Sequence, residues 1–287
     1  MTLTETWRHA RGGGKKAAAR LARRMLPRTT VTLAHVEPDL RLTVSLRRHI
    51  MFWSGGLARF EPYAVRVLRA AVEPGDVIFD VGANIGFFST LFSRWVGAEG
   101  RVLAIEPEPE NLGLLRRNLE RNRCGNVTVC ASAVGAVEGI AQFSLDGATG
   151  ATGHLGRAPT AGEMAVGKGE VQIIEAKVET IDGLVQRHAA RPRVVKMDIE
   201  GGEVHALEGA VRTLADDRPI VVSELTGDGG PAAIARLAQA GYRMWDLESG
   251  QSVVADRHPF MVVGVPNEAL DGGRDLKVQV ALRGEDR

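Results

Sequence analysis

The chain has 287 residues, 44% of them hydrophobic, enough for one large α/β domain with extensions or for two small domains. A formal net charge of +1 and an aromatic content of 5% argue against a dedicated nucleic-acid-binding protein, which normally combines a basic excess with aromatic residues for base stacking. No apolar run has the length of a transmembrane helix and no signal-peptide core follows Met1, so we expect a cytoplasmic protein. Cys124 and Cys130 lack C-x-x-C spacing and are expected to be reduced and buried.

Residues 1–29 are predicted to form a basic N-terminal arm. Eight lysine or arginine residues and no acid lie between Arg8 and Arg28. The Ala-rich stretch from Lys15 to Leu26 is compatible with a short helix, but its apolar side is too small to anchor it alone. A solvated tail is the favoured interpretation, and a weak contact of residues 8–28 with a membrane surface or a polyanion is the alternative.

Residues 30–72 are expected to form an N-terminal hairpin and a helical cap. Two short alternating runs, from Thr30 to Val36 and from Leu40 to Leu46, predict a hairpin outside the main sheet. An aromatic cluster follows, and then the apolar spacing of a helix. The cluster consists of Phe52, Trp53, Phe60 and Tyr63. These rings are predicted either to pack in the core or to wall the ligand site, with Glu61 as a polar contact in the second case.

The stretch from Val77 to Glu106 has the pattern strand, tight turn, helix and strand. The first strand is a buried apolar run that leads into D-V-G-A-N-I-G, from Asp80 to Gly86. Gly82 and Gly86 allow the backbone to approach a ligand closely, and the helix after them presents free N–H groups. The second strand ends at Glu106, whose carboxylate can accept two hydrogen bonds from a ribose diol.

The glycine pattern of this turn narrows the choice of ligand. A NAD site requires G-x-G-x-x-G and a phosphate-binding loop requires G-K-[ST], and neither occurs here. The order D-x-G-x-N-x-G with a strand-end glutamate resembles motifs I and II of class I methyltransferases, which bind S-adenosylmethionine (SAM). An acid at the end of the first strand also suits the cationic amino-acid part of SAM. The alternative is a βαβ unit whose glycine turn holds no ligand.

The middle of the chain predicts a helix from Pro107 to Arg123 and a strand from Val127 to Cys130. The turn from Ala131 to Gly135, with Ser132 and Ala133, is expected beside an adenine. The runs Ile140 to Leu145 and Val171 to Val178 predict paired strands. The Gly-rich insertion 147–169 between them is expected to be a mobile lid. His154 within it is a candidate substrate contact, although a solvated histidine is the favoured interpretation.

The last third of the chain continues the alternation of strands and helices. The predicted strands are Arg193 to Asp198, Ile220 to Glu224, Tyr242 to Leu247 and Phe260 to Val265. Helices are expected after Thr180 as N-cap, after the loop that ends at Glu203, and from Ile234 to a stop at Gly241. The second of these carries Val204, Leu207 and Leu214. This alternation predicts a doubly wound α/β sheet with its site at the carboxyl ends of the strands. Four acids fall at such ends: Asp80, Glu106, Asp198 and Glu224.

The motifs together resemble the FkbM family of SAM-dependent methyltransferases. The resemblance runs from about Phe60 to Val265 through F-E-P-Y, P-G-D-V-I-F-D-V-G-A-N-I-G-F-F-S, I-E-P, V-E-T-I-D, V-K-M-D-I-E-G-G-E and S-E-L. It implies a Rossmann-like class I methyltransferase fold with a mostly parallel seven-stranded sheet over residues 73–287. It also implies SAM as cofactor and O-methylation of a hydroxyl on a sugar, a glycosylated molecule or another natural product.

The expected cofactor contacts follow from the resemblance and from the strand ends. They are Glu61, Asp80, Gly82, Ala83, Asn84, Gly86, Phe87, Glu106, Pro107, Ser132, Ala133 and Asp198. An acceptor hydroxyl must lose its proton to a base or beside a metal, so the catalytic candidates are Asp198, Glu200, Glu224 and His154. If a divalent metal is used, Asp198 and Glu224 are its expected ligands. Glu200 and Glu203 are equally well explained as acids at a helix N-terminus.

Two other classes of function remain open. One is a non-catalytic SAM-binding scaffold tethered through its basic arm, and the other is a methyltransferase with a non-sugar small-molecule acceptor. A nucleotide-dependent oxidoreductase is disfavoured by the missing glycine fingerprint. Methylation of base amino groups is disfavoured because D-I-E-G stands where such enzymes carry an Asp/Asn-Pro-Pro-aromatic block. An oligomer is left open.

Overall fold

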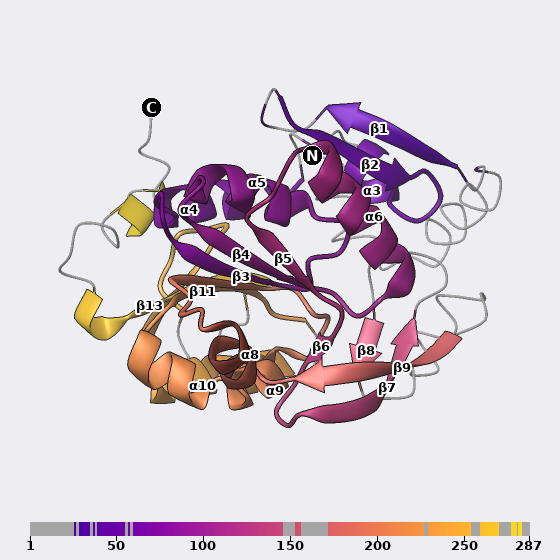
Figure 1. Ribbon diagram of the computed structural model, residues 1–287. Coiled ribbons are helices and arrows are strands. Elements are labelled where there is room, and N and C mark those ends of the chain that lie inside the picture. The colour runs from indigo at the N-terminus through magenta and orange to yellow at the C-terminus, as the bar shows by residue number, and fades with distance from the viewer. Residues whose placement is uncertain are drawn as a thin grey trace, which may run out of the picture.

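A seven-stranded sheet with the strand order β12-β13-β11-β10-β3-β4-β5 forms the centre of the molecule (Figure 1). The computed structural model describes residues 26, 29–34, 37, 39–54, 57, 60–145, 153–155, 172–226, 229–253, 259–269, 277–279 and 281–282. The strands are β3 (Val77–Val81), β4 (Arg101–Ile105), β5 (Val127–Cys130), β10 (Val194–Met197), β11 (Ile220–Glu224), β12 (Tyr242–Asp246) and β13 (Met261–Pro266). Since β13 runs antiparallel to both neighbours and β3, β4, β5, β10 and β11 pair in parallel, the predicted mostly parallel sheet is confirmed.

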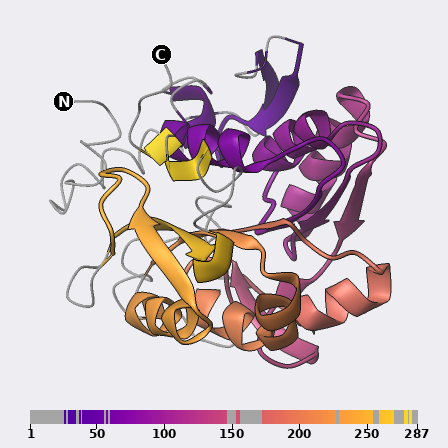
Figure 2. The same cartoon turned by 90° about the vertical axis from the view of Figure 1, so that its left-hand side faces the viewer.

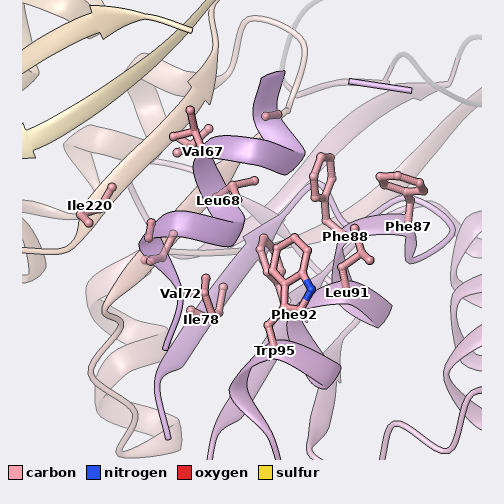
Figure 3. Close-up of a cluster of buried hydrophobic side chains, with 14 of the residues drawn as sticks. Val67, Leu68, Val72, Ile78, Phe87, Phe88, Leu91, Phe92, Trp95 and Ile220 are labelled. Atoms are coloured by element: carbon pink, nitrogen blue, oxygen red, sulfur yellow. The ribbon is translucent and has the colours of Figure 1, made fainter. Parts of the chain in front are cut away.

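Helices cover both faces of this sheet, which is why its central strands are mostly apolar, with Asp80 in β3 and Lys196 in β10 as charged exceptions. On one face lie α4 (Pro62–Ala71) and α5 (Phe87–Val96), and on the other lie α8 (Ile181–His188), α9 (Glu203–Glu208) and α10 (Gly230–Gln239) (Figure 1). Figure 2 shows the same two layers after a turn of 90°. In Figure 3, α4 and α5 place Leu68, Phe92 and Trp95 over Ile78 of the sheet. Every residue of β10 is buried, including Lys196 at its third position.

The predicted N-terminal hairpin is confirmed as a two-stranded sheet of its own. It consists of β1 (Thr30–Ala34) and β2 (Arg41–Ser45), and the short helix α3 (Ile50–Ser54) follows it. Two asparagines fasten the hairpin to the main body: Asn118 in α6 (Pro109–Arg121) and Asn122, the C-cap of that helix. Thr43 N–H donates to Asn118 Oδ1 at 2.7 Å, and Arg41 N–H donates to Asn122 Oδ1 at 2.9 Å. The side-chain amides thereby act as a partner for the β2 backbone.

A second sheet lies beside the main one and has the order β6-β9-β7-β8. Its strands are β6 (Ala133–Val134), β7 (Gly139–Leu145), β8 (Gly153–Leu155) and β9 (Gln172–Glu179). The antiparallel pairing of β7 with β9 confirms the predicted pair of strands. Apart from the backbone of β8, the Gly-rich insertion 147–169 lies outside the described residues, as do the side chain of His154 and nearly all of the basic arm.

One predicted helix N-cap is confirmed, and two predicted helices have different bounds in the structure. Thr180 is the N-cap of α8 as predicted, because its Oγ1 accepts a hydrogen bond from Gly183 N–H at 2.9 Å. The helix expected to carry Val204, Leu207 and Leu214 is divided into two elements. α9 contains Val204 and Leu207 and stops before Gly209, a weak helix former, and Leu214 lies in a π-helical turn, η2 (Thr213–Asp217). The helix expected to start at Ile234 begins at Gly230 instead, because Pro231 fits the first turn of a helix.

The two cysteines are free and buried, as predicted. The fold brings a histidine close to Cys130, although none is near it in the sequence: His188 Nε2 lies 3.6 Å from the Cys130 Sγ. Short η4 (Asn267–Ala269) follows the last strand. Within the described part of the chain, no helix combines the length and the hydropathy that crossing a bilayer requires.

Candidate cofactor cleft and carboxyl cluster

A cleft opens at the carboxyl ends of β3, β4 and β10, where open α/β sheets bind their ligands. It contains about 660 Å³ of space between protein atoms, including space open to solvent. Eight of the residues expected from the sequence line it together: Gly82, Asn84, Glu106, Pro107, Ser132, Ala133, Asp198 and Glu200. The inner side of the second sheet contributes Phe143 from β7. The cleft is therefore built from loops that are far apart in sequence.

The glycine turn after β3 passes directly against the loop after β10. Gly82 has a φ of +76°, and a Cβ at this position would lie 2.0 Å from the Asp198 carbonyl oxygen. Gly86, the N-cap of α5, has a φ of +89°. A side chain at Gly82 would therefore force the two loops apart and widen the floor of the cleft. The motif needs its first glycine for this close approach.

Glu106 is held in place by two backbone amides. Its Oε2 accepts from Asn84 N–H at 2.8 Å, and its Oε1 accepts from Glu108 N–H at 2.9 Å. The Asn111 side chain also hydrogen-bonds to this carboxylate, so three of its roughly four acceptor sites are used and one remains for a ribose hydroxyl. Burial raises the pKa of Glu106 to about 7, although the bonds from the Glu108 and Asn84 amides oppose that shift.

A buried lysine connects two of the strand-end acids. Lys196 Nζ lies 3.7 Å from Asp80 Oδ1 and 3.5 Å from Asp198 Oδ2, and it also lies 5.1 Å from the centre of the Phe88 ring. Burial alone would lower the pKa of Lys196, but the surrounding carboxylates raise it. Lys196 was not singled out from the sequence. The available signal was a lysine inside an otherwise apolar buried strand, where an unpaired charge is costly.

Asp80 is placed differently from its expected role as a direct cofactor contact. Its side chain is 0% exposed, so its carboxylate has no surface toward the cleft. Ser89 Oγ donates to its Oδ2 at 2.5 Å, and Lys196 is its cationic neighbour. Asp80 thus connects the first turn of α5 with Lys196 inside the protein.

Three carboxyl groups meet at the ends of β10 and β11 and at the start of α4. Oxygen atoms of Glu61, Asp198 and Glu224 all lie within 4.8 Å of one another. Burial, followed by the charge of Asp198, raises the pKa of Glu61 to about 8 and that of Glu224 well above its usual range. Like charges at this spacing do not all ionise, so Glu61 and Glu224 carry protons at neutral pH. The sequence predicted the meeting of Asp198 with Glu224, whereas Glu61 joins them through the packing of α4.

This carboxyl trio (Glu61, Asp198 and Glu224) also fits the oxygen ligands that Mg²⁺ or Ca²⁺ prefers. A divalent cation here would be held by the three carboxyl groups and would polarise an acceptor oxygen. Binding of this cation would require Glu61 and Glu224 to lose their protons. The positive charge of Lys196, 3.5 Å from Asp198, would also repel the cation.

Phe87, Ala83 and Glu203 are not among the residues that line the cleft. Phe87 is 2% exposed and packs against Phe60, with ring centres 4.9 Å apart, so it belongs to the aromatic core and not to the cleft lining (Figure 3). Phe52 stacks on Phe60 at 4.3 Å, which favours the core-packing interpretation of these rings. Ala83 is buried beside the turn. Glu203 closes the loop before α9, since its carboxylate accepts from Ile199 N–H and Gly201 N–H.

The chain is similar to known methyltransferases. The FkbM methyltransferase domain family matches residues 80–244, which is 165 of the 287 residues. The hexuronic acid methyltransferase AglP of Haloferax volcanii is 27% identical over 180 residues, which cover 62% of this chain and 68% of AglP. The 31-O-demethyl-FK506 methyltransferase FkbM of Streptomyces tacrolimicus is 49% identical over 67 residues, 22% of this chain and a quarter of that protein.

A solved structure, methyltransferase FkbM from Methylobacillus flagellatus KT, aligns with a TM-score of 0.43 and 20% identity over 66% of this chain and 43% of that chain. The family match spans more than half of the chain, and it includes the glycine turn, Glu106 and the loop that carries Asp198. The chain therefore belongs to the FkbM methyltransferase family, and it is a SAM-dependent methyltransferase with a Rossmann-like α/β fold.

Proposed function

We propose that this protein transfers a methyl group from SAM to a hydroxyl group of a sugar, or of a glycosylated or other natural-product acceptor. The observation that carries the proposal is the position of Asp198, which lines the cofactor cleft and also belongs to the carboxyl trio. One residue therefore faces both the cofactor space and a group of proton-holding side chains. The names of AglP and FkbM, which mention a hexuronic acid and a demethylated FK506, support an acceptor of this class.

The cleft residues divide the work of holding the cofactor. Glu106 accepts a ribose hydroxyl through its remaining acceptor site, and the turn from Gly82 to Asn84 borders the methionine part. Pro107, Ser132 and Ala133 border the adenine. All of these line one cleft, and the fixed amides on Glu106 reduce the ordering that binding requires.

The chemistry asks the protein for alignment and for a proton acceptor. SAM supplies a sulfonium-bound methyl group that is already activated. Asp198 orients the acceptor hydroxyl and takes its proton late, as the O–C bond forms and the C–S bond breaks. Glu61 and Glu224 hold protons at neutral pH, so they donate hydrogen bonds to acceptor oxygens instead of repelling them. Lys196 pairs with the Asp198 carboxylate from the protein side.

The direct test uses methyl-labelled SAM and matched pairs of acceptors, each glycoside beside its aglycone. We expect label on the glycosides, in a product that is stable to hydrolysis as an ether. Transfer to the aglycones alone would favour a non-sugar acceptor. Binding of SAM without transfer to any of a broad set of hydroxyl acceptors would favour the non-catalytic scaffold.

SAM affinity is expected to depend on pH through Glu106. Hydroxyl donors favour the ionised carboxylate, so binding lowers the pKa of Glu106 from about 7 and releases a proton. Affinity should rise with pH until Glu106 is ionised, by at most about tenfold per pH unit. Titration calorimetry at about pH 6 and about pH 8, in buffers of different ionisation enthalpy, measures both effects. Glu106→Gln should flatten the profile, and a flat profile in the unsubstituted protein would contradict this role.

A further inference from the structure

His49 lies between the hairpin and the cofactor cleft, although it is outside the methyltransferase sheet. It is 3% exposed and lies between β2 and α3, immediately before Ile50. Ser45 N–H donates to its Nδ1 at 3.0 Å. A ring nitrogen that accepts carries no proton, so the neutral imidazole has its proton on Nε2. The backbone of the hairpin thereby selects one tautomer of this ring.

That tautomer determines the orientation of an amide in the cleft. His49 Nε2 lies 3.4 Å from Asn111 Oδ1, so the Nε2–H group donates to the amide oxygen. The Asn111 nitrogen is then the atom left to face the cleft, where the Asn111 side chain hydrogen-bonds to Glu106. Asn111 and Glu106 both line the cleft. A rotated amide would turn its oxygen toward the Glu106 carboxylate and repel it.

The hairpin is well anchored for such a role. Arg48, next to His49, forms ion pairs with Glu108 and Glu110 at the start of α6. Figure 1 shows the hairpin alongside α6, which carries Asn111. Burial, followed by the nearby Arg48 charge, lowers the pKa of His49 to about 4, so the ring stays neutral under ordinary assay conditions.

We propose that His49 is a positioning residue for the cofactor, acting through the Asn111 amide on the ribose-binding carboxylate Glu106. The proposal rests on the role of Glu106 proposed above. It makes the N-terminal hairpin a working part of the cofactor site, since Ser45, His49, Asn111 and Glu106 form one chain of hydrogen bonds. Ser45 N–H is the donor of the first link, and the directions of the next two links follow from the tautomer that it selects.

Two substitutions separate the donor from the packing of the ring. His49→Phe keeps an aromatic ring against Phe52, whose centre lies 6.1 Å away, but it cannot donate to Asn111. His49→Gln keeps a side-chain N–H donor. Calorimetry with S-adenosylhomocysteine should show affinity about threefold to tenfold weaker for His49→Phe, the usual scale for one hydrogen bond, with substantial recovery in His49→Gln. In a Glu106→Gln background, His49→Phe should have little further effect.

Asn122→Ala is the matched control. It removes another link between hairpin and α6, the bonds to Arg41, about 16 Å further along the helix axis than Asn111. We expect this variant to bind S-adenosylhomocysteine with unchanged affinity. Equal losses in Asn122→Ala and His49→Phe would reduce His49 to a part of the hairpin packing and overturn the proposal. An equal loss of affinity on His49→Phe substitution with Glu106 present and in the Glu106→Gln background would also overturn the proposal.

A spectroscopic measurement needs no variant. Nitrogen-15 NMR of the unsubstituted protein should report His49 as the Nε2–H tautomer, and an Nδ1–H tautomer would overturn the proposal even if His49→Phe fails to fold. Failure of the unsubstituted protein to bind S-adenosylhomocysteine is a distinct result, because it would overturn the cofactor assignment and the relay with it. Binding together with an unchanged affinity in folded His49→Phe would overturn the relay alone.

Discussion

We expect the Asp198→Asn variant to transfer methyl groups about 10²-fold or more slowly than the unsubstituted protein, the usual scale for a general base. Asparagine keeps the shape and most of the hydrogen bonding, but it cannot take a proton. Asp198 is the member of the carboxyl trio that also lines the cofactor cleft, so neither Glu61 nor Glu224 is placed to replace it there. SAM should still bind, because Glu106 and the glycine turn are unaffected.

The measurement compares initial rates at saturating SAM and acceptor with SAM affinity by calorimetry. Asp216→Asn, which changes an exposed carboxylate of the same type, is the control and should leave both quantities unchanged. Treatment with a chelator separates two versions of the mechanism, since activity should be lost only if a divalent cation occupies the trio. Near-normal turnover in Asp198→Asn would contradict both versions.

The second large effect is expected for Glu106→Ala, which should weaken SAM binding by about 1–3 kcal/mol, the cost of losing a charged hydrogen-bond partner. The loss has two parts. The ribose loses its acceptor, and the N–H groups of Asn84 and Glu108, part-buried and buried respectively, lose the oxygens that they bond. The second part also loosens the turn that borders the methionine part.

Calorimetry with SAM on a variant that melts cooperatively measures this loss. Glu120→Ala, at an exposed glutamate of α6, controls for the change in net charge. A folded Glu106→Ala protein with unchanged SAM affinity would show that the ribose is held elsewhere. The pH profile of binding provides an independent check on the same carboxylate.

Local patterns in the sequence predicted the parts of the fold that local physics controls. β5 and β11 have the expected bounds because continuous β-branched and apolar runs favour buried strands. Thr180 was recognisable as an N-cap because its hydroxyl reaches an amide only three residues away. The end of α9 was missed because Gly209 interrupts a helical pattern that continues in the sequence beyond it.

Local sequence patterns predicted only part of the candidate site. Asp198 and Glu224 were expected to meet, because neighbouring parallel strands bring their carboxyl ends to one edge. Glu61 could not be placed there, since its position depends on how α4 packs over the sheet. Phe87 shows the opposite error: its place after the glycine turn suggested a ligand contact, but the start of α5 turns this ring into the aromatic core.

The sequence by itself therefore determined the alternation of strands and helices, the glycine turn, and the acids at strand ends, because these depend on residues that are neighbours along the chain. The tertiary structure decided which of those acids face the cleft and which face the interior. It brought Lys196 between Asp80 and Asp198, closed the trio with Glu61, and set His49 against Asn111. The physical reason is that burial and charge pairing depend on distances between residues up to 163 positions apart, such as Glu61 and Glu224, which no local periodicity records.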